Sequence, residues 1–336
     1  TQDQGGVPRF QVNNRMVMPS GYLESFKFIS RGDFAISLRS FEGGLEYCYC
    51  DGIISPAYTV LKVYSKKVYS GFYKYLFKSY SFISELQTSV VGIREGKNIS
   101  YPELSYSYLP IPPLPEQNSI AQFLDQKTAL IDQAIAQKER LIELLRERRQ
   151  VLIHRVVTRG LDQEVELKDS GVEWIGAIPR HWEVKRAKFI FNEVNDRSQS
   201  GTEELLSVSH MTGVTPRSEK NVNMFLAEDY TGSKVCEKGD LVINTMWAWM
   251  GALGVSDRKG IVSPSYGVYR QKNSKIYNFW FLENLMRCGK YIAEYNRVST
   301  GLHSSRLRLY PPKIFLLPMI LPPKKEQDRI EKLMKL

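Results

Sequence analysis

Residues 109–117 read LPIPPLPEQ and lead directly into a long stretch without proline or glycine. The prolines at 110, 112, 113 and 115 cannot lie inside a helix, because proline fixes φ and removes a backbone donor. A helix can begin right after them, where Glu116 complements the positive end of the helix dipole. The next helix-breaking residue is Gly160. Residues 116–157 therefore predict one helix, about 63 Å long at roughly 1.5 Å per residue.

This predicted helix carries a single narrow apolar seam. Its members recur at heptad-like spacings: Leu124, Ile131, Ile135, Ile142, Leu145 and Leu152. A seam so narrow does not suit burial against a small globular core, so we expect a partner helix. Basic side chains crowd the second half of the helix: Lys138, Arg140, Arg146, Arg148, Arg149 and Arg155. They suit either a solvated face near the negative end of the helix dipole or contact with phosphates.

The composition allows two domains and a connector and favours a polyanionic partner. The chain has 336 residues, with 46 Lys and Arg against 36 Asp and Glu and a pI near 9.2. Such an excess of positive charge points to nucleic acid or an anionic membrane. No apolar run is long enough to span a membrane and the N-terminus shows no signal pattern, so we expect no membrane span and a cytoplasmic location. The few, irregularly spaced cysteines are expected to be reduced structural thiols.

A duplication places similar segments on both sides of the predicted helix. The paired landmarks are Gly32-Asp33 with Gly239-Asp240, 52–58 with 260–266, the aromatic helical stretches 71–86 and 277–285, Gly92 with Gly301, and 112–117 with 322–327. The offset drifts only from 207 to 210, which indicates one true duplication. Each copy predicts a mixed α/β domain that feeds into a long helix. The first copy has fewer residues before its Gly-Asp pair and the second helix stops at Leu336, so we expect a chain incomplete at both ends.

No catalytic or cofactor motif is recognisable. Residues 92–98 (GIREGKN) match a P-loop only loosely, since one residue is missing between the glycines and asparagine replaces serine or threonine. No glycine-rich cofactor loop opens a helix after a strand. The histidines lack metal-ligand spacing, and no serine or cysteine lies in a nucleophile elbow. We therefore expect no catalytic residue, no metal and no cofactor.

Polar loops at equivalent places in the two copies are the candidate DNA-binding elements. Arg binds guanine edges or phosphates, Asn reads adenine, and Ser and Lys bind phosphate or base edges. The loop residues are Arg94, Lys97 and Asn98 in the first copy and Ser304, Ser305, Arg306 and Arg308 in the second. Trp247 and Trp249 pack either in the core or against nucleic acid, and the same ambiguity holds for Arg39, Asn244 and His303. The two loop glycines by themselves also suit simple turns.

Three features together resemble the specificity subunit of type I restriction–modification systems. They are the proline entry to the helix (111–121, IPPLPEQNSIA), the junction after it (159–162, 169–176, 178–179 and Trp182), and the duplication. The resemblance implies an α+β fold in which two mixed α/β target recognition domains are joined by a long helix that forms an antiparallel coiled-coil spacer. It implies a first recognition domain at 1–114, incomplete at its N-terminus, a spacer helix at 115–160, a second recognition domain at 161–322, and the start of a second spacer helix at 323–336.

In that family each recognition domain reads one half of a split DNA sequence, and methylation and cleavage belong to partner subunits. The resemblance therefore implies a non-catalytic subunit that binds double-stranded DNA and docks methyltransferase subunits, with the restriction subunit joining through the complex. Most of the second spacer helix is missing from the sequence, so we expect that the spacer helix of another copy can take its place in a self-associated dimer. A competing interpretation is a coiled-coil scaffold that binds proteins without DNA specificity. A self-contained nuclease or methyltransferase lacks the required motifs.

Overall fold

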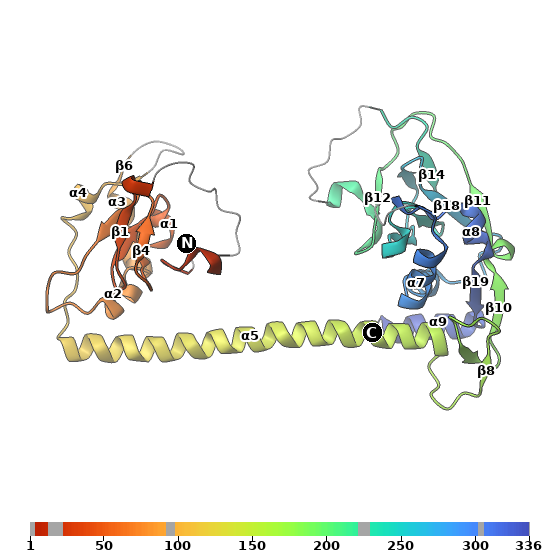
Figure 1. Ribbon diagram of the computed structural model, residues 1–336, viewed down its shortest axis with the longest axis horizontal. Coiled ribbons are helices and arrows are strands. Elements are labelled where there is room, and N and C mark those ends of the chain that lie inside the picture. The colour runs from red at the N-terminus through yellow and green to blue at the C-terminus, as the bar shows by residue number, and fades with distance from the viewer. Residues whose placement is uncertain (1–3, 13–22, 92–97, 221–228, 302–305, 336) are drawn as a thin grey trace. The chain divides into compact units, whose positions relative to one another are not determined.

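The computed structural model describes residues 4–12, 23–91, 98–220, 229–301 and 306–335. It divides into two compact units, unit 1 (Thr1–Arg140) and unit 2 (Leu141–Leu336). Helix α5 (Leu114–Arg159) contributes its first residues to unit 1 and its last residues to unit 2 (Figure 1). Among the described residues, no helix is both long and apolar enough to cross a membrane.

Unit 1 packs an antiparallel sheet in the order β3-β2-β5 against α2 and α3 around one apolar core. The ring of Phe77 lies 4.8 Å from that of Phe34 in β2, edge to face, and 4.6 Å from that of Phe82 in α3, so packed aromatic rings join the sheet to the helices. Two antiparallel pairs, β1 with β4 and β6 with β7, complete the unit. Its elements before α5 are η1 (Arg9–Gln11), η2 (Leu23–Ser25), β1 (Lys27–Ile29), β2 (Phe34–Ile36), α1 (Ser40–Gly43), β3 (Glu46–Tyr47), β4 (Gly52–Ile54), β5 (Thr59–Leu61), α2 (Ser70–Leu76), α3 (Tyr80–Thr88), β6 (Val90–Val91), β7 (Asn98–Ile99) and α4 (Tyr101–Leu104).

Unit 2 has a larger core built on a four-stranded antiparallel sheet in the order β11-β18-β15-β16. Further antiparallel pairs are β8 with β9, β10 with β19, β12 with β13, and β14 with β17. Its elements after α5 are β8 (Leu167–Asp169), β9 (Ala177–Pro179), β10 (Glu183–Arg186), η4 (Ala187–Phe189), β11 (Phe191–Val194), β12 (Leu206–Ser209), β13 (Gly213–Pro216), η5 (Arg217–Glu219), β14 (Lys234–Cys236), β15 (Leu241–Ile243), η6 (Ala248–Met250), β16 (Leu253–Val255), β17 (Gly260–Val262), β18 (Gly267–Gln271), α6 (Phe279–Met286), α7 (Gly289–Val298), α8 (Pro311–Leu316), β19 (Pro318–Leu321) and α9 (Lys324–Met334).

Helix α5 confirms the long helix expected after the prolines, with slightly wider bounds. It begins at Leu114 because Pro115 is tolerated in a first turn, and it ends before Gly160, whose φ of 79° is the left-handed conformation common after a helix. Five of the six predicted seam residues are exposed, from 41% at Leu152 to 57% at Ile131, and Leu124 is half-buried. In the part of the chain that the structure describes, most of this apolar seam therefore remains accessible.

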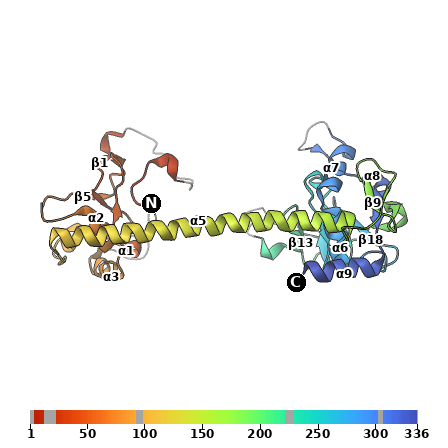
Figure 2. The ribbon, with the colours of Figure 1, turned by 90° about the horizontal axis from the view of Figure 1, so that it is seen from below.

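Helix α9 runs back along the last turns of α5 within unit 2, as Figures 1 and 2 show. Its residue Ile330 is fully buried and belongs to the same core cluster as Ile153, Val156 and Val157 of α5. The end of α5 and the start of α9 therefore pack against each other at the base of unit 2, as the antiparallel arrangement predicted from the sequence requires.

The two units repeat the same local structure. Strand β1 pairs with β4 and β2 with β5 in unit 1, and β14 pairs with β17 and β15 with β18 in unit 2, all antiparallel. Gly32 (φ 92°) and Gly239 (φ 94°) precede the central strands. The aspartates that follow them, Asp33 and Asp240, each accept a hydrogen bond from the backbone N–H three residues earlier, at 2.9 Å in both units. The duplication inferred from the sequence is thus also a duplication of structure.

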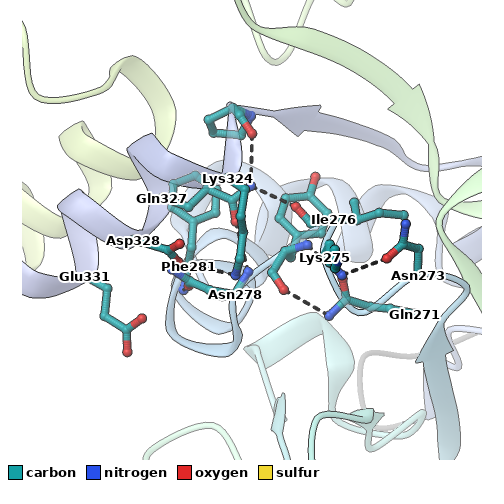
Figure 3. A network of polar contacts seen from close by, with 12 residues as sticks. Gln271, Asn273, Lys275, Ile276, Asn278, Phe281, Lys324, Gln327, Asp328 and Glu331 are labelled. Atoms are coloured by element: carbon teal, nitrogen blue, oxygen red, sulfur yellow. Dashed lines mark hydrogen bonds and ion pairs between the residues drawn. The ribbon is translucent and has the colours of Figure 1, made fainter.

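A buried glutamine fixes the start of α9 in unit 2 (Figure 3). Gln327 is fully buried and accepts a hydrogen bond from Asn278 N at 3.0 Å. Its amide nitrogen donates to the carbonyls of Ile276 and Pro322, both at 2.9 Å. The side chain therefore joins the turn before α6 to the turn before α9, and it satisfies three backbone groups where water has little access.

Gln117 makes the same three contacts in unit 1. It is fully buried, accepts from Tyr69 N at 2.8 Å, and donates to the carbonyls of Lys67 at 2.8 Å and Pro112 at 2.7 Å. In both units the acceptor carbonyls lie two residues before the donor and five before the glutamine. We call each arrangement a glutamine anchor; it explains why the glutamine of the pattern Pro-Pro-x-x-Glu-Gln, at 112–117 and 322–327, recurs where each unit passes into the helix that follows.

The structure corrects one predicted element. Residues 71–86 were expected to form one aromatic helical stretch, but the chain forms two helices, α2 and α3, around a break at Lys78 and Ser79. Ser79 has extended backbone angles, and its hydroxyl accepts a hydrogen bond from Phe82 N at 3.3 Å, which caps α3. The apolar periodicity did not reveal this cap.

Candidate nucleic-acid interface

The loop that follows the central strand of unit 2 carries the predicted tryptophans. After β15 the chain turns through residues 244–247 into η6, and the turn is closed by backbone bonds from Trp247 N to Asn244 O and from Ala252 N to Trp247 O. Trp247 is 50% exposed, and its ring stacks on Trp249 with 6.3 Å between centroids and 15° between planes. Trp249 is half-buried and donates from Nε1 to Met246 O, so it supports Trp247 from the protein side.

A backbone hydrogen bond brings the second predicted loop beside this turn. Leu309 N donates to Thr245 O at 3.0 Å, and Arg308 forms an antiparallel bridge with Thr300 through two backbone bonds. Arg306 is exposed, whereas Arg308 is half-buried and donates from its guanidinium to Leu307 O. Residues far apart in the sequence, around 247 and around 308, therefore meet on one side of unit 2.

Unit 1 places different side chains at the corresponding points. Arg39 immediately precedes α1 with φ and ψ of −120° and 12°, and Trp247 immediately precedes η6 with −124° and 12°. Asn98 pairs with Val91 as Arg308 pairs with Thr300. Arg39 and Asn98 are both exposed. The repeated backbone thus presents a cation and an amide in unit 1 where unit 2 presents an aromatic ring and a cation.

The arginines at these positions are free of acidic partners within the described residues. No ion pair there involves Arg39, Arg306 or Arg308. Other arginines of unit 2 do pair with carboxylates: Arg270, for example, pairs with Asp240 at 2.7 Å. The exposed Arg39 and Arg306 can therefore bind phosphates or guanine edges, whereas Arg308 already donates one N–H to Leu307 O.

Asn244 has an internal role. It is buried, its Nδ2 donates to the Tyr266 hydroxyl at 2.9 Å and lies 3.5 Å from Val208 O, and its Oδ1 accepts from Met246 N. Burial raises the pKa of Tyr266, which remains a neutral partner for this amide. Asn244 therefore holds the tryptophan loop against β12 instead of lying at the surface. The predicted residues Arg94, Lys97, His303, Ser304 and Ser305 lie outside the described residues.

A hairpin that the sequence analysis did not single out stands next to this loop. Strands β12 and β13 pack along β16, where Gly254 comes so close that an added Cβ would lie 2.9 Å from Val214 N. At the tip, Met211 is 78% exposed, and Arg287 holds the turn by donating to the carbonyls of His210 and Met211. The alternation of apolar and polar residues at 205–209 before Gly213 was the available signal.

The described residues offer no arrangement for metal or thiol chemistry. No group of three or more His, Cys, Asp or Glu side chains there is placed to hold a metal ion. The cysteines are free, and burial raises the pKa of the Cys236 thiol to about 11, which keeps it protonated and unreactive. What the site offers is a surface of exposed cations, amides and an aromatic ring.

Comparison with known proteins places this arrangement in a known fold. No family model matches the sequence. The crystal structure of the HsdS subunit from Thermoanaerobacter tengcongensis matches with a TM-score of 0.52 and 17% identity, over 92% of this chain and 73% of that one. The chain has the HsdS fold. This confirms the α+β class and the long helix flanked by sheet-containing units.

Two further matches agree with the HsdS fold. A chain from a structure concerned with complex assembly and conformational transition of the type I R-M system gives a TM-score of 0.56 at 18% identity, over 92% of this chain and 74% of that one. In sequence, the Escherichia coli type I restriction enzyme EcoBI specificity subunit is 24% identical over 164 residues. That match covers 47% of this chain and 34% of the length of the Escherichia coli protein. The resemblance to specificity subunits inferred from the motifs is confirmed.

Proposed function

We propose that the chain is the DNA-recognition subunit of a type I restriction–modification complex. In this proposal residues 1–114 and 161–322 are two recognition domains, each of which reads one part of a bipartite duplex site. Residues 115–160 and 323–336 belong to the spacer. The observation that supports it best is that one repeated backbone carries different side chains, the exposed Arg39 and Asn98 in unit 1 against the exposed Trp247 and the half-buried Arg308 in unit 2.

The physical argument rests on what a bipartite reader requires. Two domains with the same backbone bind similarly shaped half-sites, while different side chains at equivalent points select different bases. Unpaired arginines supply the phosphate contacts that give affinity, and the net charge of +10 attracts a polyanion. Catalysis is assigned to partner subunits, because the described residues hold no recognisable reactive constellation.

The exposed seam of α5 is the proposed contact for further helices, either of methyltransferase subunits or of a second copy. Replacing Leu145 and Leu152 by Asp puts charges on that seam, and since both side chains are about half exposed the fold itself should tolerate the change. We expect assembly with the methyltransferase subunit to be lost on a sizing column while the unfolding midpoint stays within experimental error. Replacing the exposed Gln126 and Gln137, which lie off the seam, by Asp is the matched control. Unchanged assembly of the seam variant would rule out this contact.

The decisive experiment maps the adenines that become methylated in a random DNA library when the chain is combined with its methyltransferase partner. A two-part motif with a fixed gap is the expected result. Arg306→Ala should weaken binding by about 1–3 kcal/mol and relax one position of the motif if it reads a base. Arg180→Ala removes a similarly exposed arginine and should leave the motif unchanged.

A protein-binding scaffold is the alternative function, and the salt dependence of duplex binding distinguishes it from DNA recognition. Duplex binding should fall steeply with salt, because phosphate contacts release counterions. Affinity that does not depend on salt, or equal affinity for every duplex sequence in the assembled complex, would contradict the proposal and favour the scaffold.

A further inference from the structure

The two glutamates beside the glutamine anchors have different surroundings. In unit 2, Glu326 Oε2 accepts a hydrogen bond from Trp182 Nε1 at 3.0 Å and lies 2.7 Å from His181 Nε2. Its equivalent in unit 1, Glu116, is exposed and its carboxylate has no partner among the described residues. Since the adjacent anchors are the same, unit 1 keeps the acceptor of this contact, and its described residues supply no donor.

The segment that follows Trp182 covers a second part of unit 2. Strand β10 pairs with β19. After η4, strand β11 pairs with β18, so one continuous segment adds a strand to the edge of β19 and another to the edge of β18. Beneath it, Met319 and Ile320 of β19 are almost completely buried, and Val268 and Tyr269 of β18 are fully buried. Trp182 itself is fully buried, which makes it the apolar anchor of the segment.

The corresponding edges of unit 1 are open within the described residues. Strand β5, the equivalent of β18, pairs only with β2 in the described sheet. The residues equivalent to β19 are 108–111, where Tyr108 is 100% exposed, Leu109 39% and Ile111 59%. An open strand edge is a template for another strand, and exposed apolar side chains favour a covering partner; in unit 2 one segment covers both equivalents.

We propose that this surface of unit 1, formed by Glu116, residues 108–111 and the free edge of β5, docks an extended polypeptide segment with the pattern of residues 181–194. Its tryptophan would donate an indole N–H to Glu116, its first strand would cover Leu109 and Ile111, and its second strand would pair with residues 60–63. This is strand addition, in which backbone hydrogen bonds supply affinity and a side-chain pocket supplies specificity. The inference does not depend on DNA binding.

A protein segment fits this surface better than nucleic acid. The open groups are the Glu116 carboxylate, the apolar side chains of Leu109 and Ile111 and strand-edge backbone groups, beside the exposed cation Lys62. The carboxylate at the centre of the contact repels phosphate, and apolar side chains give phosphate no partner. Unit 2 shows the same surface occupied by the chain itself, which identifies the chemistry of the occupant: an indole donor followed by two short strands separated by about one helical turn.

The test uses the full chain and a fluorescently labelled synthetic peptide with the sequence of residues 180–195. We expect saturable one-to-one binding, followed by fluorescence anisotropy. Glu116→Ala should weaken it about tenfold, because a hydrogen bond to a charged group is lost. A W182F peptide should show the same loss on the parent chain and no further loss on the Glu116→Ala chain. Ile111→Asp should abolish binding, whereas Tyr80→Asp, which changes a more exposed apolar side chain elsewhere in unit 1, should leave it unchanged.

A second measurement serves if the free peptide binds too weakly to be detected. The same sixteen-residue segment, fused before Thr1 through a flexible linker, reaches an effective concentration of about millimolar. Hydrogen exchange at residues 60–63 and 108–111 should then slow at least tenfold, and the W182F fusion should reverse part of that protection. Exchange that is the same with and without the segment would overturn the proposal.

Discussion

Gln117 and Gln327 make the same three hydrogen bonds in the two units, whereas Glu116 and Glu326, one residue earlier, do not share their contacts. Each anchor joins two turns of the same repeat that lie about 50 residues apart, and both units contain both turns. The glutamate contacts depend on a segment that packs from further away. Contacts within a repeat are therefore duplicated, whereas the contacts of Glu326 with Trp182 and His181, which lie 144 and 145 residues away, distinguish the two units.

A similar difference separates the two candidate DNA-contacting loops. Arg39 and Trp247 have nearly the same backbone angles before a short helix, yet one is a cation and the other an aromatic ring. The short helix after each residue ends at a glycine with positive φ, Gly44 at 79° and Gly251 at 83°, although ψ differs, at −174° and 24°. Different side chains on equal backbones are what two half-sites of different sequence require.

The strongest test of the shared anchors compares two single variants, Gln117→Leu and Gln327→Leu. Each substitution leaves one backbone N–H and two carbonyls without their buried partner, at about 1–3 kcal/mol for each unsatisfied group. Each should therefore destabilise its own unit by about 3 kcal/mol or more, measured by denaturant unfolding with hydrogen exchange to assign the unit. Gln122→Leu, at an exposed position of α5, is the control. A loss below about 1 kcal/mol in both units would mean that the anchors are incidental.

The comparison of Glu116 with Glu326 predicts that their substitution by Ala lowers the free energy of unfolding by unequal amounts. Glu326→Ala removes the acceptor of the fully buried Trp182 indole and should cost about 2 kcal/mol. Glu116→Ala removes an exposed carboxylate near a helix N-terminus and should cost about 0.5 kcal/mol. Thermal unfolding of the two variants measures the difference. Equal losses would show that Glu116 already has a structural role and would weaken the docking surface inferred for unit 1.

The loop comparison predicts two kinds of DNA effect. Arg39→Ala should reduce duplex affinity by about 1 kcal/mol and lower the salt slope by about one, since it removes one cation. Trp247→Ala should leave the salt slope unchanged, because it removes no charge, and alter the preferred bases in the half-site read by unit 2. Binding isotherms at several salt concentrations separate the two outcomes. A salt slope that changes equally in both variants would contradict different roles for the two loops.

The smallest predicted effect concerns a contact that occurs only in unit 1. Partial burial alone would raise the pKa of Asp125. Hydrogen bonds from Lys74 and Tyr75, both at 2.6 Å, outweigh that effect, so the pKa of Asp125 is lowered. At the position equivalent to Lys74, unit 2 has Glu283, which pairs with Arg287 instead. Because the carboxylate is half exposed, we expect Asp125→Asn to cost less than about 1 kcal/mol at pH 7.

The pH dependence of that difference follows from the direction of the shift. A folded pKa below the unfolded value of about 3.9 means that the stabilisation is complete above the unfolded pKa and is lost as pH falls through the folded pKa. The parent and the Asn variant should therefore converge in stability in strong acid. A constant difference from pH 7 to pH 2 would show that the substitution acts through packing and not through the charge of Asp125.

Much of the fold followed from the sequence because its signals are local. Proline chemistry and heptad spacing predicted α5 to within two residues at each end, and the repeated Gly-Asp pairs located the central strands. The break between α2 and α3 was missed, because a single serine cap at Ser79 overrides an otherwise continuous apolar pattern. Asn244 could not be separated from surface residues, since its partners Tyr266 and Val208 are 22 and 36 residues away.

The sequence alone determined the duplication, the long helix and the basic character of the chain, because each rests on residue order or charge that no folding step can change. Only the tertiary structure decided which residues reach the surface together. It brought the turn at Trp247 beside Arg308 through the bond between Leu309 and Thr245. It also showed that Glu326 has a buried partner while Glu116 has none within the described residues. Contacts of this kind depend on loop closure between distant segments, and residue order does not specify which distant segments will meet.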